Sequence, residues 1–222
     1  MKVQRIISLT LLAASLMIST KSQAQFSMNA GMTLGIDWAS VSTGNEGDEA
    51  LNIPGLYLSG QLDFDFTRQF GLQTRLAFVQ KGYGFDFTKY NIDLKQKHRL
   101  NYLEIPVFLK YDFLSDPEAE LEILAGPTFG FLLSEKYTVE TSLGTPEPPP
   151  ASETDKKDTG FALGLSIGKS TPSGKFSLDI MAQTSFTKSV PVSESEKGSN
   201  QYFMVGLSYY YPLVGGKNQQ NK

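Results

Sequence analysis

The chain offers few side chains for catalysis. Among its 222 residues it has one histidine, His98, and no cysteine. His98 lies in a segment that we expect to be a long loop, and no spacing of serine and acid would make it the base of a nucleophile. We therefore interpret His98 as a solvated loop residue and expect a protein that is not an enzyme. One histidine and no thiolate also argue against a metal site, and nothing indicates a cofactor.

Six charged residues are the strongest candidate constellation. Each occupies the polar register of an otherwise apolar, alternating segment: Asp63, Arg75, Glu104, Lys110, Glu122 and Asp179. If these side chains face one enclosed interior, they form either a pathway or gate for ions and small solutes, or a salt-bridged plug whose buried charges satisfy one another. The choice between the two depends on the elements that hold these residues.

The segments that carry these charges repeat with a period of two. In the first, apolar side chains from Phe26 to Trp38 alternate with small or polar ones from Ser27 to Ala39, as in a strand with one apolar face. Seven further segments alternate in the same way. The pattern predicts eight strands, at residues 26–39, 54–67, 70–81, 100–113, 121–133, 159–169, 175–187 and 201–211. Such a chain can form a lipocalin-like barrel, a sandwich or a transmembrane barrel.

Three features favour an all-β, eight-stranded, antiparallel up-and-down transmembrane β-barrel. First, the expected connections alternate between short turns, such as 67–69, and long loops, such as 82–99 and 134–158. Outer-membrane barrels have short periplasmic turns and long extracellular loops in this way. Second, the polar face holds mainly Gly, Ala, Ser and Thr with a few charges, which suits an interior just wide enough for its side chains to fill. In so narrow a lumen we favour the salt-bridged plug over the pathway.

The third feature is the position of the outward aromatic residues, which collect at both ends of the apolar stripe. We expect them to form two membrane-interface girdles in contact with outer-membrane lipid and lipopolysaccharide. The short-turn end has Phe64, Phe66, Tyr111, Phe113, Tyr209 and Tyr211, and the long-loop end has Trp38, Phe78, Phe131, Phe186 and Phe203. After residue 82 the apolar positions change parity at Tyr83 and Phe85, which predicts a bulge at Gly82.

The two ends of the chain differ from this body. Lys2 and Arg5 precede an apolar stretch from Ile6 to Ile18, and small residues stand at Ser22 and Ala24. This pattern predicts a secretory signal peptide at 1–24, cleaved after Ala24. The barrel domain is expected at 25–211, and 212–222 as a polar tail. The formal net charge is −3, and an acidic chain without a basic stripe is a poor binder of nucleic acid.

Several motifs resemble a known family. The run from Asn101 to Tyr111, the Leu124–Pro127 segment followed by Gly130, and Asp158-Thr159-Gly160 are similar to the small porin-like outer-membrane β-barrel domain common in Bacteroidetes. The resemblance covers nearly the whole chain and implies an eight-stranded barrel in the outer membrane, with no family active site to carry over. Gly206–Tyr211 also resembles the C-terminal signal read by the outer-membrane insertion machinery.

We therefore expect a monomeric integral protein of the cell outer membrane without catalytic activity. Its role would be structural, or an interaction at the cell surface through its long loops, with a partner that the sequence does not identify. The alternative is a narrow porin or solute-binding barrel that passes ions or small solutes.

Overall fold

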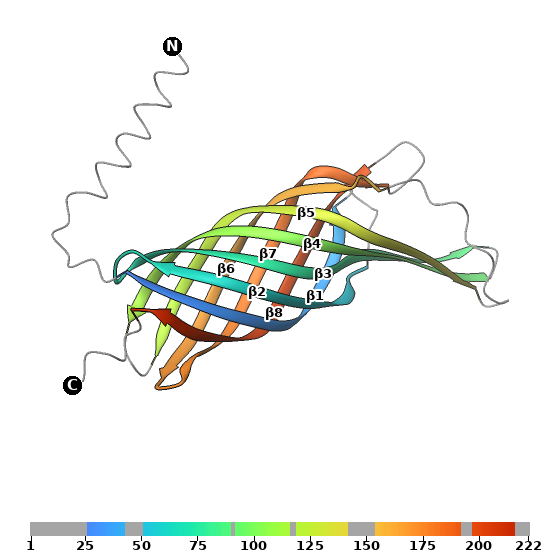
Figure 1. The fold of residues 1–222 in the computed structure, drawn as a ribbon. Helices are drawn as coiled ribbons and strands as arrows, with labels where there is room; N and C mark the ends of the chain where they lie inside the picture. Colours follow the sequence, from blue (N-terminus) through green and yellow to red (C-terminus); the bar gives the residue numbers. More distant parts are fainter. Residues whose placement is uncertain are drawn as a thin grey trace, which may run out of the picture.

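The computed structural model describes residues 26–42, 51–89, 92–115, 119–141, 154–191 and 197–215. They form a closed barrel in which each strand pairs antiparallel with its neighbour in sequence and β1 pairs with β8 (Figure 1). This confirms the predicted fold class. The strands are β1 (Ser27–Ser42), β2 (Ile53–Asp65), β3 (Phe70–Lys89), β4 (Ile92–Ser115), β5 (Glu120–Thr141), β6 (Lys157–Thr171), β7 (Gly174–Pro191) and β8 (Lys197–Val214).

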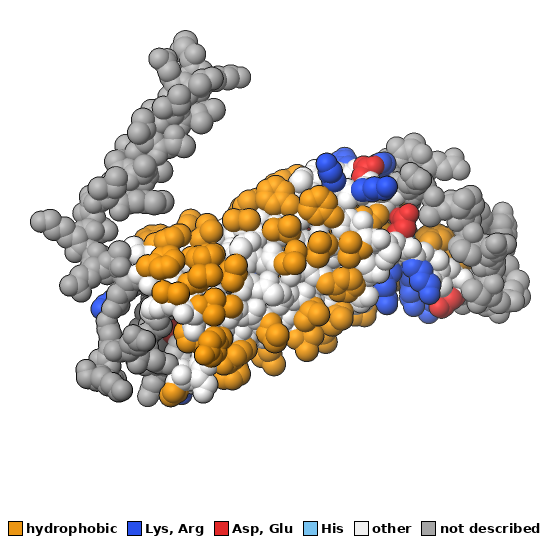
Figure 2. Space-filling model, in the orientation of Figure 1, with side chains coloured by type: hydrophobic (Ala, Val, Ile, Leu, Met, Phe, Trp, Pro, Cys, Tyr) orange, Lys and Arg blue, Asp and Glu red, His pale blue; other side chains and the backbone are white. Residues whose placement is uncertain are grey.

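The period of two separates an inner face from an outer face. In β1, Thr33 and Asp37 are fully buried, whereas Leu34 and Ile36 are more than half exposed. The other strands repeat this alternation, so the large apolar side chains cover the outside of the barrel (Figure 2). A soluble barrel would place its apolar face inside. This arrangement instead presents a hydrocarbon-like surface to the surroundings.

The height of the apolar surface matches a bilayer. Phe26, immediately before β1, and Trp38 on β1 mark its two edges and are 49% and 42% exposed. The twelve residue steps between them span about 40 Å of strand at about 3.3 Å each. With a strand tilt of about 45° the belt is roughly 28 Å tall, close to the roughly 30 Å of a hydrocarbon core. Within the described residues no helix is long and apolar enough to cross a membrane.

Three strands continue well beyond this belt. β3, β4 and β5 have 20, 24 and 22 residues, while the other five have 13 to 18. Together they project past the rim as a three-stranded sheet (Figure 1), which we call the β3–β5 extension (residues 80–89, 92–101 and 134–141). The expectation of a long loop at 82–99 was wrong, because β3 and β4 are paired continuously there from Gly82↔Arg99 to Lys89↔Ile92.

The predicted bulge at Gly82 was also wrong. The pairing of β3 with β4 keeps one register from Ala77↔Glu104 to Lys89↔Ile92, so Tyr83 continues the inward row of Arg75 and Lys81. The parity of the apolar residues changes because the surroundings change. Above the belt the outer face meets water and is polar, and the inner face supplies the apolar core of the extension. That core contains Val41, Tyr83, Leu100, Tyr102 and Val190, with Phe85 and Leu132 packed against it.

The predicted signal peptide at 1–24 lies outside the described residues, as do residues 216–222 of the polar tail. β8 runs through Val214, three residues beyond the predicted end of the last strand. β6 and β7 are joined by Pro172 and Ser173 alone, and β2 and β3 by residues 66–69. We call this end of the barrel the short-turn end.

Candidate functional site

All six charged residues of the predicted lumen network face the barrel interior, and each is at most 3% exposed. They do not form one network. The structure distributes them over three clusters, stacked from the short-turn end toward the β3–β5 extension. We call these the mouth cluster (centred on Lys110 and Lys175), the Arg75 cluster and the Lys81 cluster.

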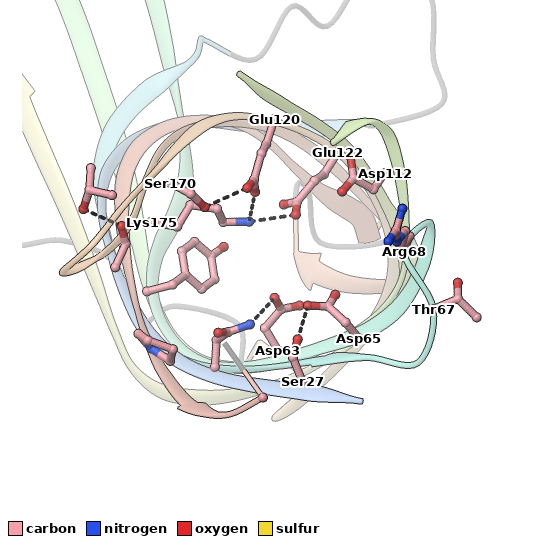
Figure 3. A pocket seen from close by; sticks show the side chains of 16 residues that line it. Ser27, Asp63, Asp65, Thr67, Arg68, Asp112, Glu120, Glu122, Ser170 and Lys175 are labelled. Atoms are coloured by element: carbon pink, nitrogen blue, oxygen red, sulfur yellow. Dashed lines mark hydrogen bonds and ion pairs between the residues drawn. The ribbon is translucent and has the colours of Figure 1, made fainter. Parts of the chain in front are cut away.

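The mouth cluster joins β2, β4, β5 and β7 at the short-turn end. Lys110 Nζ lies 2.6 Å from Asp63 Oδ2 and 3.7 Å from Glu122 Oε1. Lys175 Nζ lies 2.7 Å from the same Glu122 oxygen and 3.6 Å from Glu120 Oε2. Figure 3 shows Glu120, Glu122 and Lys175 on one side of the opening and Asp63 on the other. Lys110 therefore bridges acids on β2 and β5, and Lys175 links β7 to the acids on β5, so that the two lysines tie the opening together.

The mouth cluster surrounds a small cavity. Its volume is about 100 Å³, and its lining includes Asp63, Asp65, Glu120, Glu122 and Lys175 (Figure 3). Since one water molecule takes about 30 Å³ in the liquid, the cavity has room for a few water molecules. Within the described segments no three His, Asp or Glu side chains are arranged to hold a metal ion.

The Arg75 cluster closes the middle of the barrel. Arg75 Nη2 donates to Asp179 Oδ2 at 2.8 Å, and Arg75 Nε donates to Gln73 Oε1 at 2.9 Å. Asp179 also accepts hydrogen bonds from three serine hydroxyls at 2.8 to 3.0 Å, those of Ser166, Ser177 and Ser208. Four donors around one carboxylate compensate for its burial. The Arg75 guanidinium also lies 5.6 Å from the centre of the Phe108 ring.

The Lys81 cluster closes the barrel near its other end. Lys81 Nζ lies 2.6 Å from Glu104 Oε2 and 3.1 Å from Asp158 Oδ2. The ammonium also faces the rings of Tyr102 and Tyr202, at 5.0 and 5.2 Å. Tyr202 donates to Glu104 Oε1 at 2.7 Å, and two further side chains donate to Asp158, those of Ser185 and Asn200.

Sequence reasoning missed the cation at the centre of this cluster and one of its two acids. Lys81 stands six residues after Arg75 and therefore on the same inward parity. Asp158 was assigned to a loop, although it has the parity of Ala162 on β6 and is 2% exposed. Lys81 is the last residue of the strand predicted at 70–81 and Asp158 immediately precedes the one predicted at 159–169, so parity applied through both strand ends would have found them. Lys175 was also missed, although it is the first residue of the strand predicted at 175–187 and has the inward parity of Asp179.

The interpretation of His98 as a solvated loop residue was wrong. His98 is 2% exposed on β4 inside the extension, and its Nδ1 lies 3.2 Å from the Tyr83 hydroxyl. The Tyr83 hydroxyl donates a hydrogen bond to the Pro191 carbonyl at 2.6 Å. In its contact with His98 the hydroxyl oxygen is therefore the acceptor and Nδ1 is the donor. Burial lowers the pKa of His98, against the opposing effect of Glu135, whose carboxylate is 3.4 Å from Nε2. Burial likewise raises the pKa of Tyr83.

The interior therefore consists of side chains and not of an aqueous lumen. The largest inward residues are at most 2% exposed over the full length of the barrel: Arg75, Tyr57, Tyr102, Tyr210, Lys81, Phe108, Leu100, Leu124, Met181, Met204, His98 and Gln73. Side chains that line a continuous water channel would be exposed to solvent, and these side chains are buried, so water does not reach them. The only histidine is engaged with tyrosines and a glutamate, so it activates no serine among the described residues.

The aromatic residues predicted for the membrane interfaces all point outward, and several pair with one another. At the short-turn end the Tyr111 ring is 5.0 Å from that of Phe70 and 4.7 Å from that of Phe113. At the other end the Trp38 and Phe203 rings are 6.3 Å apart. Phe66, Phe113, Tyr211, Trp38, Phe131, Phe186 and Phe203 are 42% to 71% exposed, while Phe64, Phe78, Tyr111 and Tyr209 are half-buried.

One family model matches most of the chain. The model, described as outer membrane protein beta-barrel domain, matches residues 23–214. No curated protein sequence matches the chain.

Several solved structures resemble the barrel at low sequence identity. OprG, an outer membrane protein from Pseudomonas aeruginosa, is 12% identical with a TM-score of 0.48, covering 86% of this chain and 97% of its own. Ail, the attachment invasion locus protein of Yersinia pestis, is 15% identical with a TM-score of 0.42, covering 82% and 98%. The outer membrane protease OmpT from Escherichia coli is 11% identical with a TM-score of 0.45, covering 89% and 100%. At these identities no activity is carried over from them.

Proposed function

We propose that this chain, which belongs to the outer membrane protein beta-barrel domain family, is a closed, non-catalytic barrel that presents the β3–β5 extension to anionic partners outside the cell. The barrel anchors the extension in the outer membrane, and its interior keeps the wall rigid. The short-turn end then faces the periplasm and the extension faces outward, as in barrels with short periplasmic turns.

The observation that carries this proposal is a basic surface on the extension. Lys95 lies between Asp86 and Glu140 in the strand register, so an acid stands opposite it on each neighbouring strand. Arg99 is paired directly with Lys136, although like charges opposite one another destabilise a sheet. We call Lys97, Arg99 and Lys136 the basic patch.

The basic patch is exposed, and among the described residues it forms no salt bridge. All three side chains face water, and none of the ion pairs among the described residues engages them. Lysine and arginine gather beyond the apolar belt at this end of the molecule (Figure 2). A cost in sheet stability that no ion pair of residues 26–42, 51–89, 92–115, 119–141, 154–191 and 197–215 offsets supports a partner that supplies negative charge.

Binding to an immobilised polyanion tests the proposal. Purified barrel in detergent is passed over dextran sulfate and, in parallel, over uncharged dextran. We expect retention on dextran sulfate alone, with elution by salt, because exposed charges are screened. The triple variant K97Q/R99Q/K136Q should lose retention, while Lys169→Gln, an exposed lysine at the short-turn end of β6, should keep it. Equal retention of both variants would contradict the role of the basic patch.

Export and assembly complete the proposal. The signal peptide is removed after Ala24, the insertion machinery recognises Gly206–Tyr211, and the barrel acts as a monomer. Mass spectrometry of protein from outer-membrane fractions tests the cleavage site, since the mature chain should begin at Gln25.

A further inference from the structure

A groove runs along the outer wall of the barrel over β7, near the end that carries the extension. Its volume is about 610 Å³, within the range of about 300 to 1,000 Å³ that is usual for ligand sites. Two rows of paired residues form it. The lower row is Leu163, Ala182, Phe203 and Trp38, and the upper row is Phe161, Thr184, Gln201 and Ser40.

The groove arises because β7 contributes small side chains between larger neighbours. Ala182 forms the floor between Leu163 on β6 and Phe203 on β8, and Thr184 lies one pair higher. Trp38 and Phe203 make one wall and are 42% and 45% exposed. The groove therefore has an apolar lower row and a mainly polar upper row, and it opens sideways, toward the membrane.

Two lysines stand beside one another above this groove. The Asp155 amide donates to the Ser189 carbonyl at 2.9 Å, and the Thr159 amide donates to Thr187 Oγ1 at 2.8 Å. These two contacts bracket Lys157 and place it opposite Lys188. Both lysines are exposed, and none of the salt bridges in the described segments engages either of them.

A bulge shapes the surface between the lysines and the groove. The pairing of β7 with β8 steps from Thr184↔Gln201 to Lys188↔Ser199, so β7 carries two extra residues there. Phe186 projects from this bulge and is 71% exposed. The surface thus passes from the two lysines, across the exposed ring of Phe186, to the groove.

We infer that this surface binds one outer-leaflet lipid A, with a phosphate on Lys157 and Lys188 and an acyl chain in the groove. Two adjacent cations match a phosphate monoester, which carries a charge of about −1.5 to −2 at neutral pH, better than the single charge of a phospholipid diester. The assignment to the outer leaflet rests on the orientation in the proposed function, and the lipid site itself depends only on the groove and the lysines.

The only tryptophan of the chain lines the groove, which gives a direct assay. The full-length protein is folded in zwitterionic detergent and titrated with diphosphoryl lipid A while Trp38 fluorescence is recorded. Native mass spectrometry counts the bound lipid. We expect a saturable change in emission and one lipid per barrel, and at least tenfold weaker binding of phosphatidylglycerol.

Three variants locate the site. K157E/K188E reverses the paired charge and should weaken lipid A binding at least tenfold. Ala182→Phe fills the floor of the groove and should remove the change in Trp38 emission. Lys169→Glu places the same charge change at the short-turn end of β6 and should bind as the wild type does. Heat-modifiable gel migration checks that every variant is folded.

The outcomes separate the possibilities. Binding that does not saturate, that survives both K157E/K188E and Ala182→Phe, or that is equally tight for phosphatidylglycerol would overturn the inference. Biotinylation of Lys157 on intact cells tests the orientation independently. Labelling only after outer-membrane permeabilisation would contradict the proposed function and the outer-leaflet assignment, even if the purified barrel still bound lipid A.

Discussion

The Lys81→Met substitution tests whether buried charges hold the barrel together. Met matches the length of the lysine stem but removes the ammonium that lies 2.6 Å from Glu104 and 3.1 Å from Asp158. All three side chains are about 1% exposed, so the two acids would be left in the interior without their cation. Removal of one partner from a buried ion pair costs about 3–5 kcal/mol. We expect a loss of that size in the free energy of unfolding.

The assay is reversible urea unfolding of the barrel in lipid vesicles, followed by Trp38 fluorescence and by the gel mobility of the folded form. The triple variant K81M/E104Q/D158N removes the whole charge cluster at nearly constant volume. It should recover all but about 1–2 kcal/mol of the loss, because uncharged replacements of a buried ion pair are often close to neutral. Lys136→Met on the exposed basic patch should change stability by no more than about 0.5 kcal/mol.

Two results would refute this reasoning. A loss below about 1 kcal/mol in Lys81→Met would mean that Glu104 and Asp158 are neutralised or hydrated without the lysine. A triple variant as unstable as the single one would mean that packing against Tyr102 and Tyr202, and not charge, accounts for the effect.

Three further predictions follow from the same structure. Lys110→Ala and Glu104→Ala should each destabilise the barrel without raising conductance in planar bilayers, and a clear rise in conductance would favour the narrow-porin alternative. The pKa of His98 is lowered by folding, so as the pH falls the unfolded chain takes up a proton before the folded chain does. The amide protons of β3 and β4 should therefore become less protected from exchange below about pH 6.5. The His98→Gln variant should flatten this decline. Gly82→Ala should make the extension sensitive to protease. Gly82 has a φ of +146°, and an added Cβ would collide with the His98 carbonyl oxygen. Unchanged protease sensitivity of the variant would contradict this prediction.

Alternation alone predicted most of the wall. A residue that faces lipid must be apolar, so within the belt the outward row of every strand is visible in the sequence, and the eight strands and their parity followed from it. The same reasoning predicted that Asp63 and Asp179 face inward, since no other position would keep their charges away from lipid.

The parts that sequence reasoning missed lie where that constraint ends. Above the belt both faces of a strand can be polar or apolar, and residues 82–99 therefore resembled a loop. Pairings across the lumen were equally invisible, because Arg75 and Asp179 are 104 residues apart and meet only when the ring is closed. The segregation into three clusters depends on the stagger between strands, which no local pattern encodes.

The interior ion pairs also bear on the order in which the barrel is assembled. Arg75 on β3 contacts Asp179 on β7, and Lys175 on β7 contacts Glu122 on β5. None of these partners are neighbours in the sheet, so an open, half-inserted sheet would expose each charge singly to the bilayer, at a high cost per charge. These two cross-lumen pairs thus penalise an open intermediate, whereas Lys81 and Glu104 lie on neighbouring strands and can pair earlier. Closure should be all-or-none, with the interior acting as a check that all eight strands are present.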